Sequence, residues 1–518
     1  MNTTEALVRN LRHCPDQPAL IEGALRLNWR QLHDRVVRLA AALAAKGLCK
    51  DQRVALLLDN SARNIEATYA VQWIGATIVP INTRWTAPEI SFALADCEAV
   101  AIFADSGNAK TCAAVDPELR ARLLKIWAGE GAVPAGMLDY EALLASGTEM
   151  PRCELPATAV ASIFYTGGTT GRSKGVLLSH ANQMSHSIAM IADCALPRGL
   201  RYLHAAPMFH IADSLFTHIL TLLGGTHVIL PRFSPAGFAD AVTAEAIEMT
   251  ILVPTMIGMV MADEAIASQA FSKLDRLFYG ASPMPEALMR GLLSRYPALR
   301  LYQVYGQTES SPVLTILPPE WHGLDACRSA KARAAGRPMF GTEIRIVDVE
   351  DREVPQGEMG EIVARGPQVM SGYWQRHKET ETALRGGWLH TGDAGFIDAD
   401  GFVYVADRIK DMIITGGENV YSVEVEQAIY QMPGVAQCCV VGLPDEKWGE
   451  SVHAVVVPAP GTALSEQQIL AHCVPMLADY KRPRSASLRA EPLPLSGAGK
   501  ILKRELRDEL RKKMEARS

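Results

Sequence analysis

The sequence lacks the signals of a secreted, membrane-spanning or zinc-binding protein. Its first segment, MNTTEALVRNLRHCPDQPAL, has no apolar core of a signal peptide. No run reaches the roughly 18 apolar residues that a membrane helix needs. The ten cysteines are scattered, and neither CxxC nor HExxH occurs, so a metal or disulfide framework is not expected. We therefore predict a cytoplasmic protein with reduced thiols and no integral membrane segment.

A strongly basic balance is also missing. The formal net charge is −6, with 21% charged and 48% hydrophobic residues. This composition is typical of a globular protein and gives no reason to expect a nucleic-acid partner. Single hydrophobic cores usually divide beyond roughly 250–300 residues. Since the chain has 518 residues, we expect at least two domains.

Helical and strand patterns alternate through the first part of the chain. Trp29–Ala45 and Ser61–Gly75 have helical apolar spacing, whereas Arg53–Leu58 and Thr77–Ile81 are short apolar runs typical of buried strands. This alternation predicts an α/β fold with parallel sheets covered by helices. From about Phe340, short strands such as EIRIVD, GEIVAR and FVYVADR predict a small β-rich, more antiparallel subdomain.

The last part of the chain has the pattern of a separate unit. Helical spacing over residues 420–431 and 465–476 encloses two strand-like runs at 437–442 and 453–457. We predict a large N-terminal domain, residues 1–408, and a small mobile α+β domain, residues 409–518. The boundary depends on this change of pattern, because no low-complexity linker marks it.

Residues 165–175, YTGGTTGRSKG, combine glycines, hydroxyl groups and one lysine. A strand pattern precedes them and a short apolar run follows, so the loop is expected to join strand to strand. The P-loop motif GxxxxGK[ST] is not met, because Ser173 precedes Lys174. GxSxG around Ser173 does match a nucleophile elbow, but that motif needs a strand-to-helix turn, and no HGGG stretch occurs. A serine hydrolase is therefore the weaker hypothesis.

Two interpretations of the loop remain open from these residues alone. Glycines allow successive backbone N–H groups to turn toward one anion, and Lys174 would add positive charge. A mobile surface loop would tolerate the same composition.

The loop resembles the phosphate loop of AMP-forming acyl-CoA synthetases and the wider adenylate-forming superfamily, which includes luciferases and nonribosomal peptide synthetase adenylation domains. Gly167 stands where that family commonly has serine. Further resemblances follow in the family's order along most of the chain. They are Ala206–His210 (APMFH), Tyr279–Ser282 (YGAS), Tyr305–Glu309 (YGQTE), His390–Asp393 (HTGD), Asp407–Asp411 (DRIKD), Thr415–Asn419 (TGGEN) and Pro494–Lys500 (PLSGAGK).

The resemblance implies an ATP-dependent carboxylic acid–CoA ligase that forms an acyl-adenylate and then a thioester, releasing pyrophosphate and AMP. ATP, Mg²⁺ and coenzyme A are the implied cofactors. The implied catalytic residues are Lys500, His210, Glu309 and Thr166, of which Glu309 and Thr166 would hold the metal. The implied cofactor-binding residues are Thr166, Gly167, Gly168, Thr169, Thr170, Gly171, Lys174, Gly280, Ala281, Ser282, Tyr305, Gly306, Thr308, Asp393, Arg408, Lys410, Gly416, Gly417 and Glu418.

Each implied role suits the chemistry of the side chain. Magnesium takes oxygen ligands, which Glu309 can supply, and Asp393 can accept hydrogen bonds from ribose hydroxyls. Lys500 can offset the repulsion between a carboxylate and a phosphate. Lys410 would be the hinge between two orientations of the C-terminal domain. Taken singly, Asp393 could instead be a turn residue, and Glu309 and Lys500 surface charges.

The acyl pocket implied by the resemblance is mainly apolar, which favours a fatty, aromatic or alicyclic acid over acetate. Its positions are His210, Ile211, Asp213, Ser214, Val253, Phe278, Tyr279 and Gly306. Asp213 is predicted to N-cap a helix over residues 214–223. A stand-alone adenylation enzyme that loads a carrier protein would share every ATP motif and stays an alternative.

Minor features are interpreted more plainly. The sequence DADG at 398–401 resembles the start of a calcium loop, but its twelfth position is Ile409, so a hairpin turn is expected. The basic segment 503–513 is predicted to be a solvated helix face, and Lys481 and Arg482 are weak candidates for contacts with CoA. A homodimer, and acetylation of Lys500 by a lysine acetyltransferase, are further hypotheses.

Overall fold

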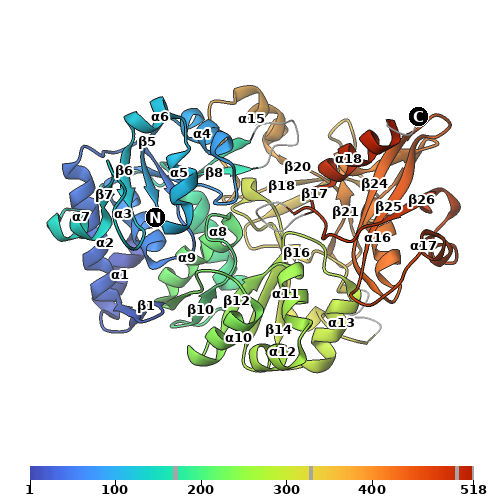
Figure 1. Cartoon of the computed structure of the whole chain (residues 1–518), viewed down its shortest axis with the longest axis horizontal. Coiled ribbons are helices and arrows are strands. Elements are labelled where there is room, and N and C mark those ends of the chain that lie inside the picture. The colour runs from blue at the N-terminus through green and yellow to red at the C-terminus, as the bar shows by residue number, and fades with distance from the viewer. Residues whose placement is uncertain (167–172, 326–330, 496–500, 516–518) are drawn as a thin grey trace.

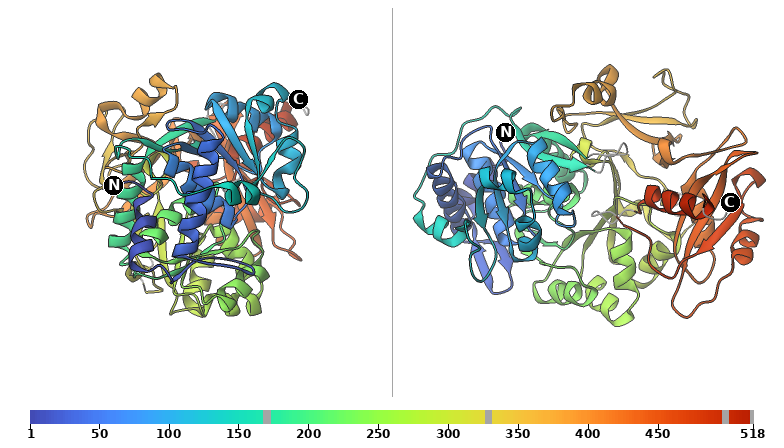
Figure 2. Two further views of the ribbon diagram at one scale, coloured as in Figure 1. Left: turned by 90° about the vertical axis from the view of Figure 1, so that its left-hand side faces the viewer. Right: turned by 45° about the horizontal axis from the view of Figure 1, so that its top comes forward.

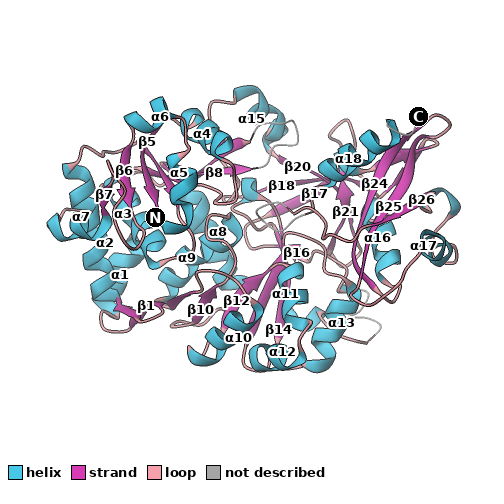
Figure 3. Ribbon diagram, in the orientation of Figure 1, coloured by secondary structure: helices cyan, strands magenta, loops and turns pink. Residues whose placement is uncertain are grey.

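Two large sheets and two smaller ones organise the chain (Figures 1 and 3). The computed structural model describes residues 1–166, 173–325, 331–495 and 501–515. The first large sheet has nine strands in the order β16-β15-β14-β13-β12-β10-β11-β1-β2. They are β1 (Pro18–Glu22), β2 (Leu25–Asn28), β10 (Arg201–His204), β11 (Thr226–Ile229), β12 (Met249–Leu252), β13 (Arg276–Gly280), β14 (Arg300–Tyr305), β15 (Thr315–Leu317) and β16 (Arg337–Pro338).

The second large sheet has eight strands in the order β19-β9-β8-β4-β3-β5-β6-β7. They are β3 (Arg53–Leu57), β4 (Thr77–Pro80), β5 (Ala99–Ala104), β6 (Leu124–Trp127), β7 (Leu138–Asp139), β8 (Val160–Thr166), β9 (Lys174–Ser179) and β19 (Gly372–Tyr373). Both large sheets are parallel through their centres and antiparallel at one or both ends. The α/β prediction is therefore confirmed.

Helices cover these sheets, as Figure 3 shows. The helices of this region are α1 (Glu5–His13), α2 (Trp29–Ala45), α3 (Ala62–Ile74), α4 (Ala87–Asp96), α5 (Ala109–Ala113), α6 (Pro117–Arg122), α7 (Tyr140–Ser146), α8 (His180–Asp193), α9 (Ile211–Leu223), α10 (Pro235–Ala244), α11 (Pro254–Met261), α12 (Glu264–Phe271) and α13 (Glu286–Arg295). None of the helices in the described ranges is long and apolar enough to cross a membrane.

Helix α3 lies in the middle of the core. All of its residues except Arg63 are buried, so it has almost no solvent-facing side. The hydroxyl of Tyr69 donates to Thr221 Oγ1 of α9 at 2.7 Å, which gives this buried polar group a partner. A helix that is buried all round is expected in the core of a large domain.

The β-rich subdomain is antiparallel throughout, as predicted. Its order is β17-β18-β20-β21, formed by Glu343–Val347, Gly360–Arg365, Leu389–Ile397 and Val403–Arg408. Helix α15 (His377–Ala383) precedes β20. Asp398 Oδ1 accepts the amides of Asp400 and Phe402 at 3.0 and 2.9 Å, which closes the turn between β20 and β21. The DADG segment is thus the predicted hairpin turn.

A five-stranded sheet forms the C-terminal unit, at the opposite end of the molecule from α1–α7 (Figures 1 and 2). Its strands are β22 (Ile413–Thr415), β23 (Glu418–Val420), β24 (Val435–Asp445), β25 (Gly449–Pro458) and β26 (Ser485–Leu488). Its helices are α16 (Ser422–Tyr430), α17 (Glu466–Cys473) and α18 (Lys503–Glu515). The nine cysteines of the described ranges form no disulfide with one another.

Candidate active site

Strands β8 and β9 form the hairpin that carries the glycine-rich loop. Thr166 and Lys174 are paired at its end, where β8 and β9 stop running side by side. The loop therefore joins strand to strand, as predicted, and Ser173 does not lie on the strand-to-helix turn that a nucleophile elbow needs. The predicted phosphate-loop residues Gly167, Gly168, Thr169, Thr170 and Gly171 lie outside the described residues.

The loop end of this hairpin is held by contacts with Asp96, the last residue of α4. Its Oδ2 accepts the hydroxyl of Tyr165 at 2.7 Å, and its Oδ1 pairs with Arg376 at 2.5 Å. The indole of Trp374 donates to the backbone carbonyl of Asp96 at 2.8 Å. Burial and the neighbouring charges raise the pKa of Tyr165, so this phenol stays a hydrogen-bond donor. The end of β8 consequently has a defined position.

Glu309 and Lys174 both contact Tyr373. Glu309 lies in the short helix η2 (Thr308–Ser310) and is 8% exposed. Tyr373 of β19 donates to Glu309 Oε1 at 2.8 Å, and the Lys174 ammonium lies 5.0 Å from the centre of its ring. A cation over a tyrosine ring at this distance is attracted to it. Sequence reasoning missed Tyr373, since its partner Glu309 is 64 residues away.

Close backbone approaches explain two of the predicted glycines. A Cβ atom on Gly280 would lie 2.3 Å from the carbonyl oxygen of Val304, and one on Gly306 would lie 2.1 Å from that of Pro312. Gly280 ends β13 and Gly306 follows β14, so these glycines allow the ends of neighbouring strands to pack together. Ala281 and Ser282 follow directly after β13, and Thr308 begins η2.

Asp393 connects two other predicted residues. Its Oδ2 accepts the hydroxyl of Tyr305 at 2.7 Å, and its Oδ1 pairs with Arg408 Nε at 2.7 Å. Asp393 is 5% exposed. Burial raises the pKa of Tyr305, and the charge of Asp393 raises it further. Three sequence motifs spread over about a hundred residues of the chain thus contribute to one polar cluster.

Glu361 supports the backbone beside Asp393, and sequence reasoning missed it. The pairing of β18 with β20 is irregular between Glu361 and Val363. There Glu361 Oε1 accepts the amide of Gly392 at 3.0 Å, while Oε2 lies 2.9 Å from His390 Nδ1. Irregular ladders re-aim side chains next to functional sites. Glu361 is the second residue of the strand-like run GEIVAR, and nothing in that local pattern points to a partner 31 residues away.

Glu361 and His390 lie beside Asp351, and these three side chains carry atoms of the kind that bind metals. Asp351, Glu361 and His390 are the one group of potential ligands that lie close enough together in the described part of the chain. The guanidinium of Arg385 already pairs with Asp351 at 2.9 Å and with Glu361 at 3.1 Å. A cation in this position would meet that positive charge, so we assign no metal to it.

The segment that leads to His210 is clamped by Asn60. The Asn60 amide donates to the carbonyls of His204 and Ala206 at 3.2 and 2.9 Å, and its Oδ1 accepts the amide of Met208 at 2.8 Å. His210 is the N-cap of α9, where its Nδ1 accepts the amide of Ala212 at 3.3 Å. The loop that presents His210 therefore has a fixed conformation.

The predicted N-cap role of Asp213 is wrong. Asp213 lies inside the first turn of α9 and is fully buried, and the cap is His210. Its carboxylate accepts the hydroxyl of Tyr202 at 2.5 Å and lies 2.8 Å from His204 Nδ1. Two tertiary partners satisfy this carboxylate better than the local backbone amides would, since a buried charge must be paired and hydrogen-bonded.

Aromatic side chains surround the predicted acyl-pocket residue Phe278. Its ring stacks on Tyr302 at 4.7 Å between centroids and contacts Phe216 edge-on at 5.5 Å. Phe216 in turn stacks on Tyr202 at 4.7 Å. Tyr279, the neighbouring pocket position, is fully buried. Ile211 and Ser214 lie in the first turn of α9, and Val253 precedes α11.

The predicted hinge and CoA residues lie at the start of the C-terminal unit. Lys410 is in the short helix η5 (Ile409–Asp411), and burial lowers its pKa although Asp411 lies 3.8 Å away. Gly416 and Gly417 form the turn between β22 and β23, and Glu418 begins β23. Lys500 lies outside the described residues.

The other basic candidates have acidic partners. Lys481 pairs with Glu424 at 2.8 Å, and Lys513 pairs with Glu509 at 2.6 Å on the exposed face of α18. The second pair fits the predicted solvated face, but Lys503 at the start of the same segment does not, because its side chain is only 16% exposed and pairs with Glu426 at 2.8 Å.

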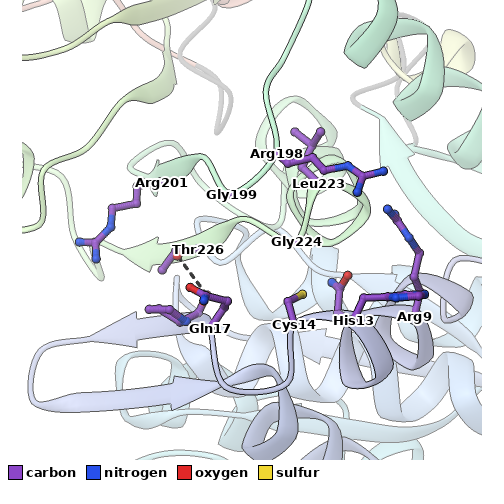
Figure 4. A pocket seen from close by; sticks show the side chains of 12 residues that line it. Arg9, His13, Cys14, Gln17, Arg198, Gly199, Arg201, Leu223, Gly224 and Thr226 are labelled. Atoms are coloured by element: carbon purple, nitrogen blue, oxygen red, sulfur yellow. Dashed lines mark hydrogen bonds between the residues drawn. The ribbon is translucent and has the colours of Figure 1, made fainter.

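A separate pocket of about 400 Å³ lies where α1 ends beside the end of α9 (Figure 4). Arg9 and Arg201 line it, but Arg9 donates to the carbonyl of Leu222 at 2.8 Å and Arg201 to that of Glu245 at 2.8 Å. The pocket is at the opposite end of α9 from His210, and the 13 residues of this helix span roughly 20 Å. It is therefore distinct from the candidate active site.

Comparisons with known proteins identify the family of the chain. The model of the AMP-binding enzyme family matches residues 7–374, and that of the AMP-binding enzyme C-terminal domain matches residues 424–500. The chain is 39% identical over 501 residues to a feruloyl-CoA synthase of Amycolatopsis sp, covering 96% of this chain and 97% of that one.

A second relative differs in its acceptor. The chain is 34% identical over 506 residues to the fatty acid–[acyl-carrier-protein] ligase ScoC of Streptomyces coeruleorubidus, covering 96% and 94% of the two chains. Among solved structures, ATP-bound MatB from Rhodopseudomonas palustris has a TM-score of 0.89 at 28% identity, covering 99% of both chains.

Proposed function

The chain belongs to the AMP-binding enzyme family and is an AMP-forming acid–CoA ligase, and we propose which of its residues carry the two half-reactions. The observation that supports the assignment best is the convergence of Tyr305, Asp393 and Arg408 in one cluster, with Lys174 and Glu309 sharing Tyr373. These are side chains suited to a ribose and to a phosphate chain.

The first half-reaction joins the acid to the α-phosphate of ATP and releases pyrophosphate. Two anions must approach each other, so fixed cations and N–H donors lower the barrier. We assign the β- and γ-phosphates to residues 166–171 and Lys174, the ribose to Asp393, and the adenine to Gly280–Ser282 and Tyr305. Lys500 would stabilise the charge that develops between the carboxylate and the α-phosphate.

We assign Mg²⁺ to Glu309 and Thr166. A carboxylate and a hydroxyl are oxygen ligands of the kind that Mg²⁺ takes, beside phosphate oxygens and waters. When bound, the metal would neutralise phosphate charge. Tyr373 would hold the Glu309 carboxylate in a single orientation through its 2.8 Å hydrogen bond. Removing Mg²⁺ with EDTA should stop adenylation. Tyr373→Phe should raise the Mg²⁺ concentration needed for the half-maximal rate.

The second half-reaction transfers the acyl group to the CoA thiol. We propose that residues 409–518 form the mobile domain and that Lys410 is its hinge. Lys410 lies in the short segment between β21 and β22, and a hinge residue absorbs a change of backbone angles at such an element end and need not be small. Gly416, Gly417 and Glu418 would line the path of the thiol. Lys410→Pro should slow the overall turnover, since proline fixes φ. An unchanged turnover would contradict the hinge.

The acid substrate is proposed to be aromatic, fatty or alicyclic. Phe278, Tyr302 and Phe216 form an apolar wall beside the predicted acyl pocket, and His210 would lie at its entrance. Such a wall contributes binding energy for apolar area but offers little to acetate. The resemblance to a feruloyl-CoA synthase supports the aromatic choice.

The decisive experiment measures AMP release with ferulate, a long-chain fatty acid and acetate, each with and without CoA. The proposal expects release that needs CoA and is much faster with the larger acids. Lys500→Ala should abolish adenylation yet leave thioester formation from supplied acyl-adenylate nearly intact. An equal loss in both steps would contradict the role of Lys500.

A carrier protein is the second candidate acceptor, because the relative ScoC is named for one. If so, a carrier protein that bears a pantetheine arm should support AMP release in place of CoA in the same assay. A homodimer, a cytoplasmic location and acetylation of Lys500 remain predictions. Acetylation would remove the positive charge of this lysine, so acetylated protein should no longer release pyrophosphate.

A further inference from the structure

Asp407 links the large domain to the C-terminal unit. It lies on β21, where it pairs with Ala394 of β20, so it belongs to the β-rich subdomain. Its Oδ2 accepts the backbone amide of Ser422, the first residue of α16, at 2.6 Å, and also the Ser422 hydroxyl. Asp407 is 5% exposed and Ser422 is fully buried. The contact therefore crosses the segment that contains Lys410.

A second element of the C-terminal unit joins this contact. Lys503, the first residue of α18, donates to the Ser422 hydroxyl and pairs with Glu426 Oε1 of α16 at 2.8 Å. The Lys503 side chain is 16% exposed. Burial opposes its positive charge, but Glu426 and Asp407 together raise its pKa above the ordinary value. Lys503 thus stays charged beside two carboxylates.

The position of Lys503 gives the cluster a bearing on the chemistry. Ile501 forms a bridge with Leu495, and the amide of Leu502 donates to the carbonyl of Pro494 at 2.9 Å. The described residues on either side of positions 496–500 are therefore paired with each other just before Lys503. In the proposed rotation, Ser422 and Lys503 would move with the C-terminal unit, whereas Asp407 would stay with the large domain.

A rotation about Lys410 must change the distance between Asp407 and Ser422. The contact can therefore exist in one arrangement of the two domains and not in another. The arrangement described here superimposes over 99% of the chain on ATP-bound MatB with a TM-score of 0.89. The contact is present in an arrangement similar to that of an ATP-bound relative.

We propose that Asp407, Ser422 and Lys503 form a latch that stabilises the domain arrangement used for adenylation and must open for thioester formation. This deepens the proposed function and rests on its two half-reactions. Asp407 and Lys503 act as positioning residues, since they do not touch the reacting atoms. The latch stabilises one of two states, so removing it shifts the population toward the other.

The test measures each half-reaction separately in Asp407→Asn and Ser422→Ala. Pyrophosphate release from ATP and acid reports adenylation, and thioester formation from supplied acyl-adenylate and CoA reports the second step. We expect adenylation to fall by about tenfold, the effect of losing one charged hydrogen bond, with the second step unchanged or faster. Lys503→Met combined with Glu426→Gln tests the lysine without leaving an unpaired buried carboxylate.

Two matched controls separate the latch from a loss of stability. Lys513→Met removes an exposed lysine of the same helix as Lys503, which pairs with Glu509, and Ser465→Ala removes the N-cap of α17 in the same unit. Neither should change the ratio of the two rates, although Ser465→Ala should lower the melting temperature. The latch is overturned if folded Asp407→Asn and Ser422→Ala proteins lose both steps in equal proportion.

A second measurement needs no substrate, so it stays informative if the wild-type protein shows no ligase activity. Trypsin can cut after Arg408 and Lys410, which flank the latch. An open latch exposes this segment, so Asp407→Asn and Ser422→Ala should be cut several-fold faster than wild type and Lys513→Met. Equal cutting rates would contradict the latch, whereas inactivity of the wild type alone would contradict only the proposed function.

Discussion

The hydroxyl of Tyr305 donates a 2.7 Å hydrogen bond to Asp393 Oδ2, although 88 residues separate them in the chain. The other carboxylate oxygen pairs with Arg408 at 2.7 Å. Tyr305 ends β14 of a large sheet, and Asp393 and Arg408 are paired on β20 and β21 of the antiparallel subdomain. The bond therefore fixes the subdomain against the strand end where we place the nucleotide.

Asp393→Ala should raise the KM for ATP by at least about tenfold, because it removes a charged acceptor that binds more strongly than a neutral one. Tyr305→Phe should raise it less, since the carboxylate stays paired with Arg408. Initial-rate kinetics with ATP and acid varied separately check this. If the KM for the acid rises as much as that for ATP, the ribose assignment of Asp393 is wrong.

Glu361→Ala should raise the KM for ATP by about fivefold with little change in kcat, since it releases the Gly392 amide next to Asp393 and also removes the partner of His390 and Arg385. Glu361→Gln keeps an acceptor for that amide and should recover part of the loss. The matched control is Glu343→Ala on the same sheet, whose partner Arg365 is exposed. Equal effects of Glu343→Ala and Glu361→Ala would argue against a positioning role.

Asp213→Ala should lower the free energy of unfolding by about 3 kcal/mol, because Tyr202 and His204 would lose a buried charged partner. Chemical denaturation of the two proteins measures the difference. Asp240→Ala is a suitable control, since Asp240 is exposed and accepts a hydrogen bond from the side chain of Gln269. A change below 1 kcal/mol in Asp213→Ala would mean that the site relaxes around the missing carboxylate.

The buried histidines should make the protein less stable in mild acid. Burial lowers the pKa of His186 and of His218 to about 3. Below the unfolded pKa of about 6.5, the unfolded chain binds protons that the folded protein excludes, so stability falls as pH falls. Each histidine should cost about 2 kcal/mol at pH 5 relative to pH 8.

Denaturation at several pH values tests this effect. His218→Gln should reduce the slope of stability against pH between 6.5 and 5, whereas replacing the exposed His13 by glutamine should not. If stability rose as the pH fell from 6.5 to 5, protons would be binding to the folded protein instead.

Local patterns in the sequence were enough to predict the elements whose stability is mostly local or periodic. The helix predicted at Trp29–Ala45 has those bounds in α2, where Asn28 and Gln31 form a capping box. The strand-loop-strand reading of residues 165–175 and the antiparallel character after Phe340 are also confirmed. In each case neighbours in the chain supply the periodicity, the cap or the turn that defines the element.

Tertiary structure decided which side chains meet. Tyr373 and Glu309 are 64 residues apart, and Lys503 and Ser422 are 81 residues apart, so no local pattern could pair them. Asp213 shows that tertiary contacts can also override a local preference. A helix-capping preference of about 1 kcal/mol predicted its role, but the requirement to pair a fully buried carboxylate outweighs it. The sequence by itself determined the elements and the motifs, while long-range packing determined the partners, because buried charges and polar groups must find theirs wherever the fold brings them.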